Sequence, residues 1–572
     1  MELAMSPFAQ FAISCLLVAS LSATSISQEP EEHVHAAPVS EEGLGRAHMD
    51  ISCARTVAPK FDRALALLHN FWYARALDGF RQVSSADPEC AMAYWGAAMT
   101  YNHPLWDAPS AADETAAWGF VQKGLAAKRM SSRERLYLNA VAALFKDSGA
   151  GLKAARDAAY RDAMATAYAS YPDDETKLFF GLAILGTARE GTKGFDDQIR
   201  AAKLFEEVYA HIPDHPGVLH YLIHAYDDPV HAERGLTVAR AYAKTAAAVP
   251  HALHMPSHIF TRLGYWEESA ATNEKAWKVS EDDAQRAGES GALRDFHSLN
   301  YLEYAYLQLG RYRDARRTLD ITAAQFESLP DKNTATDTPD LQARHVRGRT
   351  IYALPGRVVY GYFDMLTRYV VEAGDWDGAA KIPLLVPSRD FIGLKLQLET
   401  MAAAAHTNAV GAKVAAEKLV VLAQEPGQHP FVQQIILMQA KQAQALAAKA
   451  SGNPVEAVAK MKQAVAIEDG IDTLSQPPYP IIPAHELFGT LLMALHRPAD
   501  ALEQFLQTLK RTPGRPKAIF GIAQAAQAIG DQEMAQQRYQ EFLTLWRDAD
   551  GDRPEVAKAK EFLANMATAA QK

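Results

Sequence analysis

Cysteine is scarce in this sequence: the 572 residues contain 3 cysteines. Cys15 lies within a short apolar run near the N-terminus, which leaves Cys53 and Cys90 for the remainder of the chain. Two cysteines form at most one disulfide, and an exported protein favours that bond. Two small buried thiols are the alternative. We expect Cys53 and Cys90 to be bridged.

Long hydrophobic runs are also lacking. The apolar stretch FAISCLLVASLSA (11–23) is too short to span a bilayer, and small residues follow it. It indicates a signal peptide over 1–23, with cleavage as late as 27 as the alternative, and then a flexible acidic lead over 28–45. We therefore expect an exported protein, periplasmic or extracellular, without stable membrane insertion after signal cleavage.

An excess of positive charge is absent as well. Lys and Arg number 58 against 68 Asp and Glu, and the net charge is −10. This balance excludes the basic footprint of a nucleic-acid-binding protein. The sequence also lacks a Gly-rich phosphate loop, a G-x-S-x-G motif and a Cys–His pairing near a helix start. No catalytic residue is therefore assigned.

Residues that favour helices dominate after the lead. Ala, Leu, Glu, Gln and Lys are abundant, and Pro and Gly fall between amphipathic segments. One spacing recurs, in Ala76, Phe80, Val83 and Pro88, and again in Ala501, Phe505, Thr508 and Pro513. Ala lets two helices approach closely, and the aromatic residue fills the space between hairpins. The pattern predicts a nearly all-helical chain of antiparallel hairpins from about 60 to 565.

These blocks resemble tetratricopeptide repeats (TPRs) over roughly 61–546. Blocks such as DPECAMAYWGAAM, HYLIHAYDDP and HMPSHIF are similar to those of a group of exported bacterial TPR proteins without a settled activity. The resemblance implies an all-α, right-handed superhelical solenoid whose concave groove binds a protein segment or a small polar ligand. We expect an N-terminal TPR-like solenoid over 46–350 and C-terminal repeats over 351–565.

Histidine is concentrated in one part of the chain. The sequence has 19 histidines, and His211, His215, His220, His224, His231, His251, His254 and His258 all fall within 211–258. His220 and His254 are 34 residues apart, as are His224 and His258, which is one TPR period. The segment NYLEYAY (300–306) aligns with both, so Asn300 and Tyr304 occupy the equivalent positions.

The resemblance places these positions on first helices that line the groove, with Asp227 and Asp228 following HYLIHAY. Residues four apart share one helix face, so the four imidazoles and a carboxylate are expected to converge. Three interpretations stay open. The patch binds a polar ligand or protein segment, or its histidines are structural. The third interpretation is a divalent transition metal held by His220, His224, His254 and His258, in a metal-binding protein or a metalloenzyme.

The other histidines are expected to be structural or solvated. His211, His215 and His231 lie in loops or at helix ends, and His69 is interpreted as satisfied between helices. The aromatic stripe that contains His103 and Trp106 is typical of a core. His33 and His35 belong to a solvated tail.

Overall fold

The computed structural model describes residues 43–105, 109–146, 153–188, 194–329, 344–346, 349–351, 354–385, 388–425, 430–471, 481–551 and 553–570. The expected signal peptide, His33, His35 and Trp106 lie outside these ranges, and so does most of the expected acidic lead.

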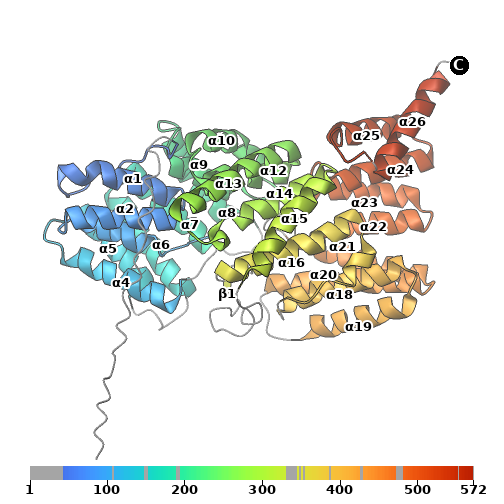
Figure 1. Ribbon diagram of the computed structural model, residues 1–572, viewed down its shortest axis with the longest axis horizontal. Coiled ribbons are helices and arrows are strands. Elements are labelled where there is room, and N and C mark those ends of the chain that lie inside the picture. The colour runs from blue at the N-terminus through green and yellow to red at the C-terminus, as the bar shows by residue number, and fades with distance from the viewer. Residues whose placement is uncertain are drawn as a thin grey trace, which may run out of the picture.

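Helices in consecutive hairpins make up nearly all of the described chain (Figure 1). The N-terminal part contains η1 (Arg55–Val57), α1 (Ala58–His69), α2 (Tyr73–Ala86), α3 (Ala91–Met99), α4 (Ala111–Ala126), α5 (Ser132–Phe145), α6 (Lys153–Ser170), α7 (Asp174–Thr187), α8 (Asp196–Tyr209), α9 (Pro216–Tyr226), α10 (Ala232–Thr245), α11 (Pro250–His254), α12 (Pro256–Leu263), α13 (Trp266–Ala287), η2 (Gly291–Leu293), α14 (Phe296–Gln308) and α15 (Tyr312–Glu327). The C-terminal part contains α16 (Leu354–Ala373), α17 (Trp376–Ala379), α18 (Arg389–Ala405), α19 (Ala409–Gln424), α20 (Pro430–Ala450), α21 (Pro454–Asp469), α22 (Ala484–Ala494), α23 (Pro498–Arg511), α24 (Pro516–Ile529), α25 (Gln532–Leu545) and α26 (Pro554–Ala570).

The expected all-α fold is confirmed. A short antiparallel pair of strands, β1 (Arg344–Val346) and β2 (Arg349–Ile351), is the exception among the described residues. It lies between α15 and α16.

The recurring aromatic and small residues pack as their spacing predicts. Phe80 is fully buried, and its ring lies where a Cβ on Gly96 of the next hairpin would stand, 2.3 Å from that atom. Phe505 lies in the same way between Gly489 and Gly521, with 2.7 Å to either virtual Cβ. Glycine on one hairpin therefore makes room for the aromatic ring of its neighbour.

The C-terminal repeats pack against the middle of the chain, beside α13 to α15 (Figure 1). Gly264 ends α12 with a φ of 75°, and a Cβ there would lie 2.3 Å from the carbonyl oxygen of Pro513. The indole Nε1 of Trp266 donates to the carbonyl of Gly514 at 2.7 Å. One hydrophobic core then runs from Trp266 to Phe562 through both regions. This contact lies next to α12, and the shared core includes residues of α14; both helices carry part of the histidine cluster.

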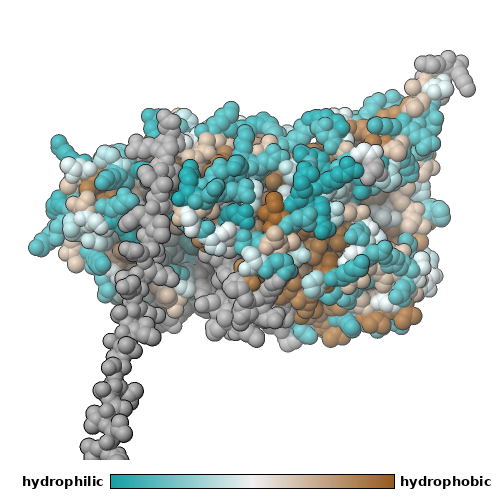
Figure 2. Space-filling model, in the orientation of Figure 1, coloured by the Kyte–Doolittle hydropathy of each residue, from teal (hydrophilic) through white to brown (hydrophobic). Residues whose placement is uncertain are grey.

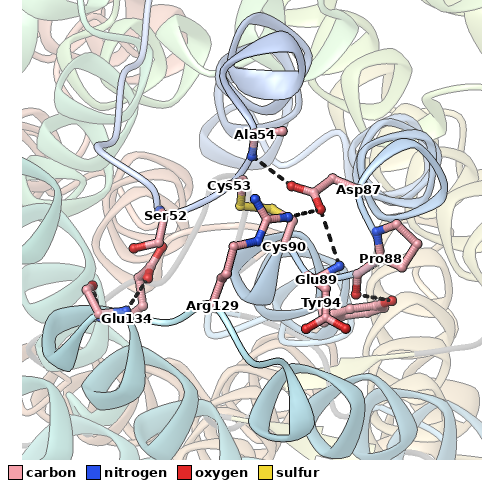
Figure 3. The surroundings of a disulfide bond; sticks show 11 residues. Ser52, Cys53, Ala54, Asp87, Pro88, Glu89, Cys90, Tyr94, Arg129 and Glu134 are labelled. Carbon is pink, nitrogen blue, oxygen red and sulfur yellow. Dashed lines mark hydrogen bonds and ion pairs between the residues drawn. A yellow bond between two sulfur atoms is a disulfide. The ribbon is translucent and has the colours of Figure 1, made fainter.

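Cys53 and Cys90 form the disulfide expected from the sequence, with Cα atoms 4.7 Å apart (Figure 3). It joins the segment before α1 to the N-terminus of α3. Asp87 beside it accepts from the backbone N–H of Ala54 at 2.7 Å and pairs with Arg129. Because both sulfur atoms are part of the disulfide, the cluster of Cys53, Asp87 and Cys90 offers no thiolate to a metal.

The face drawn in Figure 2 is largely hydrophilic, and apolar residues gather mainly in its lower part towards the C-terminal repeats. Within the described ranges, none of the helices combines the length and the apolar character that a membrane span requires.

Candidate metal centre

Histidine side chains from successive hairpins meet on one side of the repeat array. They are His220 and His224 of α9, His251 and His254 of α11, His258 of α12 and His297 of α14. Their ring nitrogens fall into two groups, and within each group the candidate ligand atoms lie within 4.8 Å of one another. The first triad is His220, His224 and His251, and the second triad is His254, His258 and His297.

The first triad turns its Nε2 atoms towards each other. His220 Nε2 lies 3.1 Å from both His224 Nε2 and His251 Nε2. His220 Nδ1 faces the carbonyl oxygen of His69 at 2.7 Å, so Nδ1 carries the hydrogen of the neutral ring. The lone pair of His220 Nε2 therefore points at the other two rings. Nitrogens about 2.0–2.1 Å from one ion stand roughly 3.3 Å apart in a tetrahedral site, so this spacing is close to that of a ligand set.

The second triad has the same arrangement with stronger orienting contacts. His258 Nδ1 donates to Asp227 Oδ2 at 2.9 Å, because a carboxylate only accepts. His254 Nδ1 donates to Asn273 Oδ1 at 2.7 Å, and the amide of Asn273 is fixed by its own donation to the Ser269 carbonyl. The two Nε2 atoms nevertheless lie 3.0 Å apart. Two lone pairs at that distance repel each other unless a cation lies between them.

Burial makes a proton on three of these rings unfavourable. Burial is the largest cause that lowers the pKa of His254 well below 6.5, and it lowers the pKa of His220 to about 3. The pKa of His251 is also lowered well below 6.5, by burial and then by the neighbouring imidazoles. At neutral pH these rings are uncharged and can ligate a metal without losing a proton.

Asp227 holds the second triad in place from behind. Although burial acts to raise its pKa, the charge of Arg262 and the contact with His258 lower that pKa below its ordinary range. Arg262 Nε donates to Asp227 Oδ1 at 2.9 Å, so the carboxylate is neutralised and both oxygens are engaged. A carboxylate that orients a ligand histidine in this way is typical of metal sites in proteins.

The two triads are adjacent and reachable from solvent. Ring centroids of His224 and His258 are 6.2 Å apart, and those of His251 and His254 are 6.1 Å apart. His297 is exposed, and His224 and His251 are partly exposed. Phe71 lies against the first triad, and Tyr301 lies against both buried rings of the second. The centre thus has apolar walls and an open side.

A third group, which consists of His69, His215 and Glu175, lies nearby. Its ring nitrogens bond to protein groups rather than facing one another. His69 Nε2 and His215 Nε2 contact the two oxygens of Glu175 at 2.9 Å and 3.0 Å. His69 Nδ1 bonds the hydroxyl of Tyr221 at 2.9 Å, and His215 Nδ1 accepts from the N–H of Gly217 at 3.1 Å. Every nitrogen of this Glu175 cluster already has a protein partner, which makes it a structural network. It also explains His69 and His215 without a ligand, as expected.

The structure brings some of the predicted site residues together and places the others outside the cluster. The structure brings His220, His224, His254 and His258 together as predicted, and Asp227 stands behind them. Asp228 instead accepts from the N–H of His231 at 2.8 Å at the start of α10. Asn300 and Tyr304, which the repeat alignment placed at positions equivalent to the histidines, have partners outside the cluster. Asn300 donates to Asp364 at 2.8 Å, and Tyr304 accepts from Arg515 at 3.0 Å.

Sequence reasoning missed His251 and His297 as members of the centre. His251 was counted in the histidine-rich window without a role, and His297 lies outside that window. The available signal was spacing within helices, since His251 precedes His254 by one turn and His297 precedes Tyr301 by four residues. Pro256 starts a new helix between His254 and His258, yet the two rings still meet.

Comparison with known proteins gives only distant likenesses. No family model matches the sequence, and no curated protein matches it. Human IFIT1, solved as a dimer with PPP-AAAA, is 12% identical with a TM-score of 0.35, covering 77% of this chain and 88% of that one. A TPR protein from Parabacteroides merdae is 12% identical with a TM-score of 0.30, covering 55% of this chain and 97% of that one. Cut9 in the APC/C Cut9–Hcn1 hetero-tetramer is 11% identical with a TM-score of 0.30, covering 89% of each chain. All three likenesses are too distant to indicate a ligand.

Proposed function

We propose that this protein is a helical-repeat scaffold that binds transition-metal ions at the two histidine triads. The observation that carries the proposal is the pair of Nε2 lone pairs of His254 and His258, which face each other at 3.0 Å. Both rings are held in this orientation by Nδ1 donation, to Asn273 and to Asp227. A cation bound between the two rings satisfies both lone pairs.

The alternative of a groove that binds a polar ligand through these histidines fits the geometry less well. Such a groove requires imidazole N–H groups directed at the ligand. Here the N–H groups of His220, His254 and His258 point into the protein instead, at His69, Asn273 and Asp227. The lone pairs that remain are ligands for a cation and repel an anion.

Donor chemistry narrows the class of metal. The proposed ligands are imidazole nitrogens only, and these suit Zn, Cu, Ni and Fe rather than Mg, Ca or Mn, which favour oxygen donors. We further propose that the protein works outside the cytoplasm. The apolar run at 11–23 and the Cys53–Cys90 disulfide support that location, since disulfides persist in oxidising compartments.

Metal titration of the purified mature chain tests the proposal. The metal-free protein is titrated with Cu, Zn, Ni and Co salts, and bound metal is counted per chain after desalting. We expect stable binding of at least one of these metals. The variant His258→Asn retains a side-chain N–H near the Nδ1 position and removes the Nε2 ligand, so it should lose binding at the second triad.

His211→Gln is the matched control. His211 lies in the same histidine-rich window, but its side chain is half exposed and bonds Asp174, away from both triads. This variant should bind metal as the parent protein does. A parent protein that retains none of the four metals, or a His258→Asn variant that binds as well as the parent, overturns the proposal.

A further inference from the structure

The two triads lie directly next to each other. Within the triads, ring centroids are separated by 4.8 Å for His220 and His224 and by 4.9 Å for His254 and His258. Between the triads, the shortest separations are only slightly longer, at 6.1 Å and 6.2 Å. Ions held in the two triads would therefore be neighbours, and the ions of known two-metal sites are about 3.5–4 Å apart.

The donors of each triad are identical in kind. Each triad offers three imidazole nitrogens, and no carboxylate or thiolate completes either set among the described residues. The nearest carboxylate, Asp227, has its oxygens on His258 and Arg262, and the two cysteines are bridged. Non-haem iron commonly takes two histidines with a carboxylate, whereas copper accepts sites made of imidazole and heads the affinity order for nitrogen donors.

The charge that two bound ions would bring to the centre also favours copper. Two divalent ions bring four positive charges to a centre whose proposed ligands are imidazole nitrogens only. Asp227 is the one carboxylate in contact with a ligand histidine through a described hydrogen bond, and Arg262 already neutralises it. Cuprous ions bring half that charge, which lowers the cost of placing both ions in a partly buried site. In the cupric state, the excess charge favours a small anion shared between the ions.

We infer that the centre holds a pair of copper ions, one in each triad, close enough to share one bridging ligand. This inference rests on the proposed function and deepens it by naming the metal and the pairing. His297 is exposed, and His224 and His251 are partly exposed, so a small exogenous ligand can approach both triads from the solvent side of these rings. Phe71 and Tyr301 lie against the rings from other sides.

Copper stoichiometry and spin coupling test the inference. The mature chain is loaded anaerobically with Cu(I), desalted, and oxidised with ferricyanide, which takes one electron from each copper. We expect two coppers per chain and an electron paramagnetic resonance signal that accounts for well under half of the total copper. Two Cu(II) ions that share a bridging ligand couple their spins and lose most of that signal, whereas isolated Cu(II) ions retain it.

Two variants convert the pair into single sites. His258→Asn removes a ligand of the second triad, and His220→Asn removes one of the first while retaining an N–H for the His69 carbonyl. Each variant should bind one copper, and after oxidation that copper should give its full signal. His251→Gln tests the first triad again at a ring that is less buried, should His220→Asn unfold the protein. Thermal melts of the variants and of His211→Gln establish folding.

The outcomes separate the inference from the proposed function. Two coppers with full signal, a single copper in the parent protein, or Zn²⁺ that displaces Cu(I) under anaerobic competition would each overturn the copper pair while leaving metal binding intact. Absence of any bound transition metal overturns both. Copper bound at random to surface histidines is recognised by equal loading of the parent and both Asn variants, and it overturns the inference as well.

Discussion

Two histidine clusters lie side by side in this molecule, and they differ in where their hydrogens point. In the Glu175 cluster, the imidazoles donate to one central carboxylate and accept from Tyr221 and Gly217. In the two triads, three of the rings use Nδ1 to bond the surrounding protein and turn bare Nε2 atoms inwards. Both clusters hold histidines close together, and the hydrogen-bond pattern around the rings separates a structural network from a candidate metal centre.

The comparison also shows how each cluster is stabilised in the absence of a ligand. Although burial acts to raise it, the pKa of Glu175 is lowered below its ordinary range by His69 and His215. The Glu175 cluster is therefore internally balanced and contributes to the stability of the fold. The triads contain lone pairs that repel, so they contribute more to stability when a cation is bound.

The largest expected effect is on metal binding. In the double variant His220→Asn/His258→Asn, each triad loses one ligand, and we expect stable metal binding to disappear from both. Affinity should fall by more than the roughly 10–100-fold that loss of an orienting partner costs. Titration of metal-free protein measures this, with Glu175→Gln as a comparison that retains both triads. Equal loss in Glu175→Gln would remove the distinction between the clusters.

Glu175→Gln should act on stability instead. The amide accepts from one histidine but presents its own N–H to the other, so one buried donor loses its partner. We expect a loss of about 1–3 kcal/mol in the free energy of unfolding at pH 7. Chemical denaturation measures it, and the metal affinity of the folded variant should match that of the parent. An unchanged stability would show that the Glu175 cluster is not a structural network.

Asp227→Asn probes the support behind the second triad. The amide retains the contact with His258 through its oxygen, but it loses the negative charge that orients the ring and strengthens its Nε2 lone pair. Metal affinity at the second triad should fall by about 10–100-fold, with little change at the first triad. Competition titration against a chelator of known affinity measures this. A loss of the same size at both triads would indicate a general change in the fold.

Acid should weaken the Glu175 cluster first. Because the folded-state pKa of Glu175 lies below its ordinary value of 4.5, the unfolded chain takes up the proton more readily than the native protein. The stabilising contribution is present above about pH 4.5 and is lost as the pH falls below it. The charged and titratable neighbours of Glu175 are His69, His215, Arg133, Tyr137 and Tyr221. Melts from pH 6 to 3 should show a smaller decline for Glu175→Gln than for the parent, and parallel curves would contradict this.

The sequence predicted the repeat architecture because helix hairpins are local structures. The aromatic and small residues that define them, such as Phe80 and Phe505, lie at fixed offsets within a few turns of helix. The period of 34 residues then placed His220 beside His224 and related both to His254 and His258, since equivalent positions in successive repeats face the same way.

The same reasoning failed where the repeats are irregular. α11 and α12 replace one continuous helix, and α13 has 22 residues where α10 has 14. Through this irregularity, α14 presents His297 and Tyr301 to the second triad, while Asn300 and Tyr304 bond Asp364 and Arg515 from more distant parts of the chain. Alignment by repeat period assumes equal helix lengths, and that assumption does not hold here.

By itself, the sequence determined the helices, their order and the clustering of four histidines, because all three follow from spacing along the chain. Only the tertiary structure decided that His251 and His297 complete two triads, and that Asp227 lies behind a ligand ring rather than among the ligands. It also decided which nitrogen of His220, His254 and His258 carries the hydrogen, through the His69 carbonyl, Asn273 and Asp227. The physical reason is that a ring nitrogen has one lone pair or one hydrogen to present, and the partner that selects between them comes from another helix.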